Sequence, residues 1–280
     1  MTETLEVNTD MDVARHNTQH QSETEEPNQY SPEPMLNLPR VGSSIGWMVV
    51  FFLMSALSGF LYAVYFGLQE GFIAGLHHTE VDASTFGVQI KNNLETPIGR
   101  TITAVLQFVL VIPIIFFAAK FPGQSAAKTL AITKVPKNIL RRWILYFAGY
   151  WLFSVAFLHF IHETDSSFTQ SLRGSKHFGL AITIAVIAPI IEELIFRGYL
   201  YKAWRFTRLG FVGALILISA LFTVIHAGQY QWPTLLVIFC FSVLLGTARE
   251  KTGSVLVPIL LHAINNTLAA VLVIYLGANI

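Results

Sequence analysis

The sequence predicts an all-α fold, a polytopic transmembrane helical bundle with a polar intramembrane cavity. Of its 280 residues, 53% are hydrophobic and only 12% are charged. The apolar residues form long blocks, and seven of these blocks are each long enough, or nearly so, to cross ~30 Å of hydrocarbon at about 1.5 Å per residue. Several ionisable residues interrupt the later blocks, which predicts the cavity.

The first forty residues differ from the rest of the chain. Residues 1–40 contain eight acidic and two basic side chains and no long apolar run, a composition typical of a disordered segment. They have neither the basic start nor the short apolar core of a signal peptide, so we expect the first membrane helix to be retained as an anchor. We therefore predict an acidic cytoplasmic tail over residues 1–40 and a transmembrane helical domain over 41–280.

The hydropathy of residues 41–280 indicates seven membrane spans. Their expected limits are about 44–67, 99–120, 142–162, 178–201, 210–227, 232–248 and 253–277. The connection near 68–98 could hold a short helix or part of a further span, so a count of eight stays open. Lys and Arg cluster in the connections after the second, fourth and sixth spans, which lie on one side of the membrane. The positive-inside rule then predicts a cytoplasmic N-terminus and an external C-terminus.

Other classes of protein have little support. The chain has no basic stripe interleaved with aromatic residues, so we expect no nucleic-acid partner. Cys240 is the single cysteine and cannot form an intrachain disulfide. The partner expected from composition is the lipid bilayer, and the short chain favours a bacterial plasma membrane.

The fourth span carries Glu192, Glu193 and Arg197 within an otherwise apolar block. Ionisable groups at membrane depth are costly and are therefore candidates for function. Glu193 and Arg197 are spaced i and i+4 and can pair on one face, whereas Glu192 points about 100° away. We expect Glu193 to be structural and Glu192 to be available for proton transfer. Alternatively, all three are structural, with Glu192 paired to a neighbouring helix.

Two further groups of polar residues follow in the fifth and seventh spans. His262 and Asn266 are also spaced i and i+4, so an imidazole and a carboxamide face the same way and could stabilise an oxyanion. His226 is a lone histidine on an apolar helix, which is compatible with either packing or catalysis. Phe222, one turn earlier, is expected to support the packing of His226.

These groups can meet only if the fourth helix continues past Arg197. Aromatic and apolar residues persist beyond it, so we predict a helix that runs to about Phe206. Counted from the turn that follows, Glu192 then lies roughly 21 Å along its helix and His226 roughly 24 Å along its own. The two residues would share one layer near mid-membrane with the polar groups of the seventh span.

Prolines precede two of the polar groups. Pro189 lies three residues before Glu192, and Pro258 lies four residues before His262. Each is expected to remove a backbone hydrogen bond and to kink its helix.

The ordered motifs resemble those of one known family. They are Glu192-Glu193-x-x-x-Arg197, Phe222-x-x-x-His226 and His262-x-x-x-Asn266, on three membrane helices. This set resembles the signatures of the CPBP intramembrane proteases, also called the Abi family. That family includes type II CAAX prenyl endopeptidases and bacterial proteins linked to bacteriocin self-immunity and peptide processing. The resemblance covers about residues 178–277.

The resemblance implies an intramembrane endopeptidase that hydrolyses a peptide bond of a membrane-associated or lipidated peptide or protein. By position, Glu192 would activate the attacking water with help from His226. His262 and Asn266 would polarise the scissile carbonyl and hold its oxyanion.

By the same resemblance, Glu193 and Arg197 would support the site structurally. The family has also been described as metalloproteases, and Glu192, His226 and His262 could ligate zinc beside a bound water. The chain lacks a His-Glu-x-x-His motif, however, and a glutamate-type mechanism needs no permanent metal. We therefore expect no required cofactor, with zinc as the alternative.

Two other functions fit the same polar residues. In a proton-coupled transporter, Glu192, His226 and His262 would form a proton path, although the spans show no evident inverted repeat. A noncatalytic scaffold or immunity protein would bind a peptide in the cavity.

Overall fold

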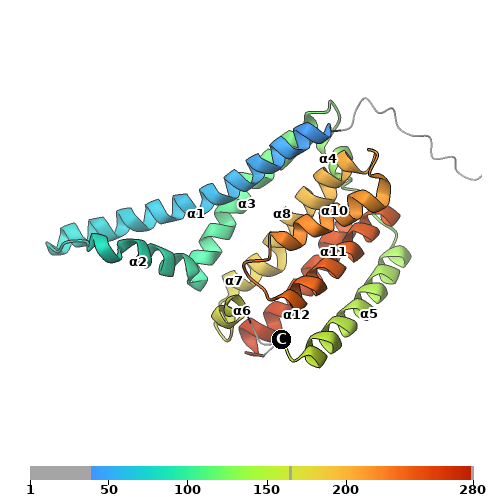
Figure 1. The fold of residues 1–280 in the computed structure, drawn as a ribbon. Helices are drawn as coiled ribbons and strands as arrows, with labels where there is room; N and C mark the ends of the chain where they lie inside the picture. Colours follow the sequence, from blue (N-terminus) through green and yellow to red (C-terminus); the bar gives the residue numbers. More distant parts are fainter. Residues whose placement is uncertain (1–38, 164–165, 279–280) are drawn as a thin grey trace, which may run out of the picture. The chain divides into compact units, whose positions relative to one another are not determined.

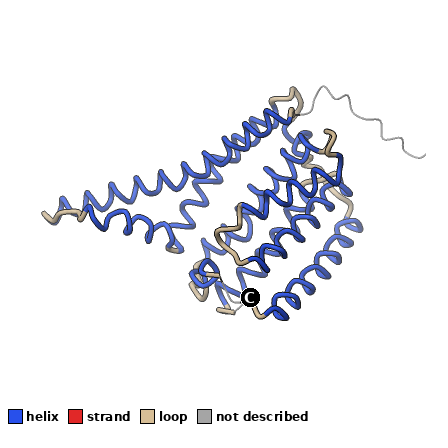
Figure 2. Tube along the Cα trace, in the orientation of Figure 1, coloured by secondary structure: helices blue, strands red, loops and turns tan. Residues whose placement is uncertain are grey.

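The described residues of the computed structural model are 39–163 and 166–278. In these two ranges every regular element is a helix and no strand occurs, as Figure 2 shows. The predicted all-α class is therefore confirmed. The predicted acidic tail, residues 1–40, lies outside the described residues except for its last two positions.

Six helices are long and apolar enough to cross a membrane. They are α1 (Val41–His77), α3 (Pro97–Lys120), α5 (Lys137–Ile161), a continuous helix Phe178–Trp204, α11 (Trp232–Thr252) and a helix Leu256–Tyr275. The fifth predicted span is the shorter apolar helix α10 (Gly210–Val224). Its 15 residues reach roughly 22 Å, less than the ~30 Å of a typical hydrocarbon core. Each of the seven predicted spans thus coincides with a helix.

Two of these helices change type along their length (segments labelled η are π-helical). The helix Phe178–Trp204 consists of α7 (Phe178–Ile182), η2 (Thr183–Ile187), α8 (Ala188–Glu193), η3 (Leu194–Leu200) and α9 (Tyr201–Trp204). The last helix consists of α12 (Leu256–Ala270) and η4 (Val271–Tyr275). Three short helices occupy connections: α2 (Ala83–Glu95), α4 (Ala126–Leu130) and α6 (Ser167–Leu172).

The first connection contains a short helix and not an additional span. α1 continues to His77, about ten residues beyond its predicted end, and α2 follows after Asp82, whose side chain accepts a hydrogen bond from the Ser84 amide. Thr96 then caps α3, which begins at Pro97. Threonine at the cap and proline in the first turn both favour a helix start.

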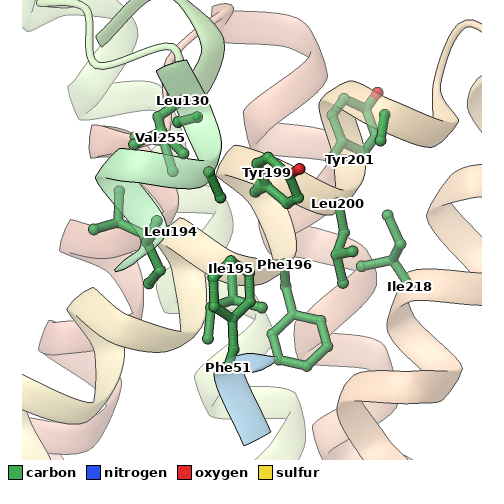
Figure 3. Close-up of a cluster of buried hydrophobic side chains, with 14 of the residues drawn as sticks. Phe51, Leu130, Leu194, Ile195, Phe196, Tyr199, Leu200, Tyr201, Ile218 and Val255 are labelled. Carbon is green, nitrogen blue, oxygen red and sulfur yellow. The ribbon is translucent and has the colours of Figure 1, made fainter. Parts of the chain in front are cut away.

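The fourth membrane helix does continue past Arg197, as predicted, and ends at Trp204. Its continuation is buried in the main hydrophobic cluster, shown in Figure 3. There the apolar side chains of η3 and α9 meet Phe51 of α1, Leu130 of α4 and Ile218 of α10. Trp204 also donates from its indole nitrogen to Ser44 Oγ at 2.8 Å. Burial of these aromatic residues explains why the helix does not stop at the arginine.

The helices that carry the predicted site residues are neighbours (Figure 1). α11 contacts α10 on one side and α12 on the other, and α12 contacts η2 and α8 of the fourth span. α5 packs against α11 and α12, while α1 packs along α3. This arrangement brings α8, α10 and α12 around one central position.

The two prolines occupy different positions in their helices. A kink at Pro258 is wrong, because α12 begins at Leu256 and its first backbone bond runs from the Ile259 amide to the Val255 carbonyl. Pro258 therefore lies in the first turn, where an amide would have no intrahelical acceptor. Pro189 is the second residue of α8 and lies two residues after the π-helical segment η2, whose wider turn is a known cause of helix bending.

Candidate functional site

The centre of the site is the buried pair formed by Glu193 and Arg197. Their side chains are 0% and 1% exposed, and Arg197 Nη1 donates to Glu193 Oε1 at 2.9 Å. The predicted i,i+4 pair therefore forms. The same Glu193 oxygen accepts a second bond from His262 Nδ1 at 2.8 Å. Because one carboxylate oxygen takes both bonds, Glu193 joins the fourth span directly to α12.

Arg197 is fixed from two further helices. Its Nη2 donates to the backbone carbonyl of Ser242 at 3.1 Å and to the Ser242 hydroxyl at 2.6 Å. Its guanidinium carbon lies 4.5 Å from the centroid of the Phe222 ring, within the range of a cation–π contact. The arginine therefore connects α11 and α10 to the carboxylate that holds His262.

His262 lies between the two glutamates. Its Nδ1 faces Glu193, and its Nε2 lies 3.8 Å from Glu192 Oε2. That second distance is too long for a hydrogen bond. Glu192 is 24% exposed, so the second carboxylate is accessible where the first is enclosed.

His226 lies just beyond the end of α10. Its Nδ1 is 2.7 Å from the carbonyl oxygen of Phe222. Since a carbonyl can only accept, this bond requires the proton on Nδ1, which leaves Nε2 of the neutral ring as a free acceptor. The Phe222 ring separates the two imidazoles, with ring centroids 4.9 Å from His226 and 5.8 Å from His262.

Asn266 projects from α12 one turn after His262. It is half-buried, and its Nδ2 donates to the carbonyl of Ile184 in η2 at 3.0 Å. Its Oδ1 accepts from the side chain of Asn265 at 3.2 Å. One carboxamide hydrogen is thereby committed to the π-helical segment, and the second stays available to another acceptor.

The predicted residues therefore fall into two sets. Glu193, Arg197 and His262 are joined by direct bonds, and Glu192 Oε2 lies 3.8 Å from His262 Nε2. The imidazole that faces Glu192 is that of His262. The His226 ring contacts Phe222, which in turn contacts the His262 ring. His262 of the third motif therefore lies closer to Glu192 than His226 of the second motif does.

Three residues of the site have no signature in the sequence. Ser242 is one small polar residue within an apolar helix, and Arg249 of α11 is buried with its Nε 3.0 Å from the Arg197 carbonyl. Tyr230 follows His226 by four residues, a spacing that predicts a contact only within a continuous helix, and the predicted span ends at about residue 227. Burial, followed by the charge of Glu192, raises the pKa of the Tyr230 phenol to about 12, so it stays protonated at neutral pH.

The arrangement does not fit the zinc alternative. Within residues 39–163 and 166–278, no three His, Cys, Asp or Glu side chains come together as ligands of one metal ion. We therefore derive no catalytic step through a metal.

Comparison with known families gives an independent result. A family model described as type II CAAX prenyl endopeptidase Rce1-like matches residues 174–268. That segment contains every predicted site residue, from Glu192 to Asn266. The chain therefore carries an Rce1-like domain. The match agrees with the resemblance to CPBP intramembrane proteases, and with six candidate spans it identifies an integral membrane protein.

Curated relatives of the chain come from bacteria. It is 30% identical to the UPF0177 protein YajF of Lactococcus lactis over 53% of this chain and 76% of YajF. It is 35% identical to an uncharacterized 24.3 kDa protein of Escherichia coli over 31% of this chain and 41% of that protein. It is 28% identical to the uncharacterized protein YyaK of Bacillus subtilis over 57% of this chain and 56% of YyaK. The match thus spans less than two thirds of the second and third of these proteins, and no solved structure matches the chain.

Proposed function

We propose that this protein is an intramembrane endopeptidase that hydrolyses a peptide bond in a membrane-associated or lipidated peptide or protein. One observation carries the proposal: His262 faces the buried Glu193–Arg197 pair with one ring nitrogen and the accessible Glu192 with the other. A histidine oriented by an enclosed carboxylate, beside a second carboxylate open to a substrate, is an arrangement suited to acid–base catalysis.

Glu192 acts as the general base in the proposed reaction. It takes a proton from water while the water oxygen bonds to the carbonyl carbon and the carbonyl π electrons move to the carbonyl oxygen. When the C–N bond breaks, the leaving nitrogen receives that proton from Glu192, which restores the carboxylate. Nε2 of His226, the free acceptor of that ring, assists in orienting the water.

The developing oxyanion is stabilised from α12. A doubly protonated His262 donates from Nδ1 to Glu193 and directs its Nε2 hydrogen to the oxyanion, while the second amide hydrogen of Asn266 points to the same charge. Donors of this kind are each worth about 10²–10³ in kcat. Glu193 and Arg197 hold His262 in place and do not touch the substrate.

The proposed setting is a bacterial plasma membrane with a cytoplasmic N-terminus and an external C-terminus. The bacterial relatives support that location, and the basic connections support that orientation. In a bacterium, a signalling peptide, a bacteriocin or a membrane-protein remnant is a more fitting substrate than a prenylated CAAX protein.

The test is the variant Glu192→Gln, with the exposed Glu80→Gln as a matched control. N- and C-terminal peptidomics of cells that produce each form at equal abundance identifies cleavage products, and the purified forms are then assayed on the peptides found. We expect products with the native protein and with Glu80→Gln, and at least a hundredfold lower turnover with Glu192→Gln.

Two results would overturn the proposal. Native turnover by Glu192→Gln would remove the assigned base and favour a noncatalytic peptide-binding role. Proton-coupled uptake by reconstituted protein, without peptidase activity, would favour the transporter.

A further inference from the structure

Tyr230 lies outside the three sequence motifs and contacts the histidine of the second motif, His226, as well as a further aromatic residue, Phe168. It lies in the connection between α10 and α11, and its ring stacks on His226 with centroids 6.3 Å apart and planes inclined by 29°. The Tyr230 ring also makes an edge-to-face contact with Phe168 of α6, with ring centroids 5.7 Å apart and planes inclined by 77°. Tyr230 therefore contacts both a motif histidine and a separate helix.

Phe168 is itself fixed in place. The guanidinium carbon of Arg100, at the start of α3, lies 5.1 Å from the Phe168 ring centroid. Arg100 also donates from Nη2 to Ser171 Oγ of α6 at 3.1 Å, and from Nε to the carbonyl of Glu95 at 2.8 Å. The arginine thus ties α6 to the junction of α2 and α3, and Tyr230 packs against a held surface.

His226 needs such a support because its own tether is limited. The residue lies past the last turn of α10, and the bond from its Nδ1 to the Phe222 carbonyl fixes one edge of the ring. A single hydrogen bond still allows the imidazole plane to rotate about that bond. Ring contacts with Phe222 and Tyr230 restrict the rotation and so determine where Nε2 points.

Glu192 is the charged group that adds to the raised pKa of the Tyr230 phenol, after burial. The tyrosine therefore lies in the field of the proposed base as well as against His226. Its ring belongs to the environment of the site and is not a remote packing element.

We propose that Tyr230 is a positioning residue, whose ring holds the His226 imidazole so that Nε2 faces the water activated by Glu192. This inference rests on the proposed endopeptidase function. It assigns the task to the aromatic ring and not to the hydroxyl, because the ring makes the contacts with His226 and Phe168.

The kinetic test compares Tyr230→Leu with Tyr230→Phe. Removing the ring should lower kcat about tenfold to a hundredfold, since a small misplacement of a catalytic group has effects of that size. KM should change less than about threefold because Tyr230 orients a catalytic group and does not bind the ground state. Tyr230→Phe should restore kcat to within about threefold of the native value. Tyr275→Leu, a tyrosine substitution on η4, serves as the matched control and should leave kcat unchanged.

A second measurement does not depend on activity. Diethyl pyrocarbonate modifies accessible imidazoles, and mass spectrometry reports the rate at His226. The rate should rise at least several-fold in Tyr230→Leu and stay native in Tyr230→Phe and Tyr275→Leu, with unchanged thermal midpoints confirming that each variant folds.

The outcomes separate this inference from the proposed function. Native kcat in Tyr230→Leu, or an unchanged His226 modification rate, would overturn the role of Tyr230 while Glu192→Gln still loses activity. An inactive native protein would instead overturn the endopeptidase proposal, and the modification rates would still decide whether Tyr230 holds His226.

Discussion

Glu192 and Glu193 are adjacent in the chain but have different surroundings. Glu193 is fully enclosed and accepts bonds from Arg197 and His262, whereas Glu192 is partly exposed and opposes the free nitrogen of His262. Helical geometry explains the difference, because consecutive residues point about 100° apart. This division could be predicted from spacing alone. The contacts of Arg197 with Ser242 and Phe222 could not be predicted in this way, because those two residues lie on other helices.

The first prediction at the residue scale concerns stability. Arg197→Met should destabilise the protein by about 3–5 kcal/mol, because it leaves Glu193 buried without its cation. Glu192→Gln should change the free energy of unfolding by less than about 1 kcal/mol, since that side chain is partly exposed. Thermal midpoints in detergent measure both effects. A second substitution, Glu193→Gln, in the Arg197→Met background should recover part of the loss; equal midpoints for native and Arg197→Met protein would contradict the bracing role.

A second prediction concerns metal dependence. We expect 1,10-phenanthroline or EDTA to leave the turnover of purified protein unchanged, because the histidines and carboxylates of the site are not arranged as a set of three ligands. The control is a structurally related chelator analogue that does not bind metal. Loss of turnover with the chelator, recovered by stoichiometric zinc, would restore the zinc alternative.

Among the helices, the fourth span shows which features could be predicted from sequence. Its extension past Arg197 follows from the apolar and aromatic residues that continue to Trp204. Its π-helical segments could not be predicted, because each involves a donor distant in sequence. Asn266 donates to the Ile184 carbonyl in η2, and Arg249 donates to the Arg197 carbonyl in η3. Carbonyls released by a wider turn need such partners when they are buried.

Arg249 provides a prediction at this scale. It is 7% exposed, its Nε bonds the Arg197 carbonyl, and its guanidinium carbon lies 5.6 Å from the Tyr201 ring centroid. Arg249→Leu should destabilise the protein by about 1.5–3 kcal/mol by removing a charged donor from a buried carbonyl. Hydrogen exchange of the amides in η3 should accelerate, while the exposed Lys251→Leu serves as control. Unchanged exchange in η3 would show that Arg249 does not support the π-helical segment.

For the whole molecule, hydropathy predicted the helices but not their lengths. α1 is about ten residues longer than expected, and α10 is shorter and ends before His226. α1 packs along α3 and against α2, and α10 packs along α11. The continuous fourth span could be predicted from hydropathy, whereas the approach of His262 to within 3.8 Å of Glu192 depends on the packing of α12 against α8.

The orientation of the molecule can be tested by cysteine labelling in intact cells. The background is Cys240→Ala, which removes the single native cysteine. One variant adds Glu80→Cys, before α2, and another adds Lys134→Cys, in the basic connection before α5; both positions are exposed. α3 is the one helix between them that is long and apolar enough to cross a membrane, so we expect the two positions on opposite sides. A membrane-impermeant maleimide should label the Glu80→Cys variant in intact cells. It should label the Lys134→Cys variant only after permeabilisation, because basic connections stay on the cytoplasmic side. The reverse pattern would invert the proposed topology, and labelling of both in intact cells would show that α3 does not cross the membrane.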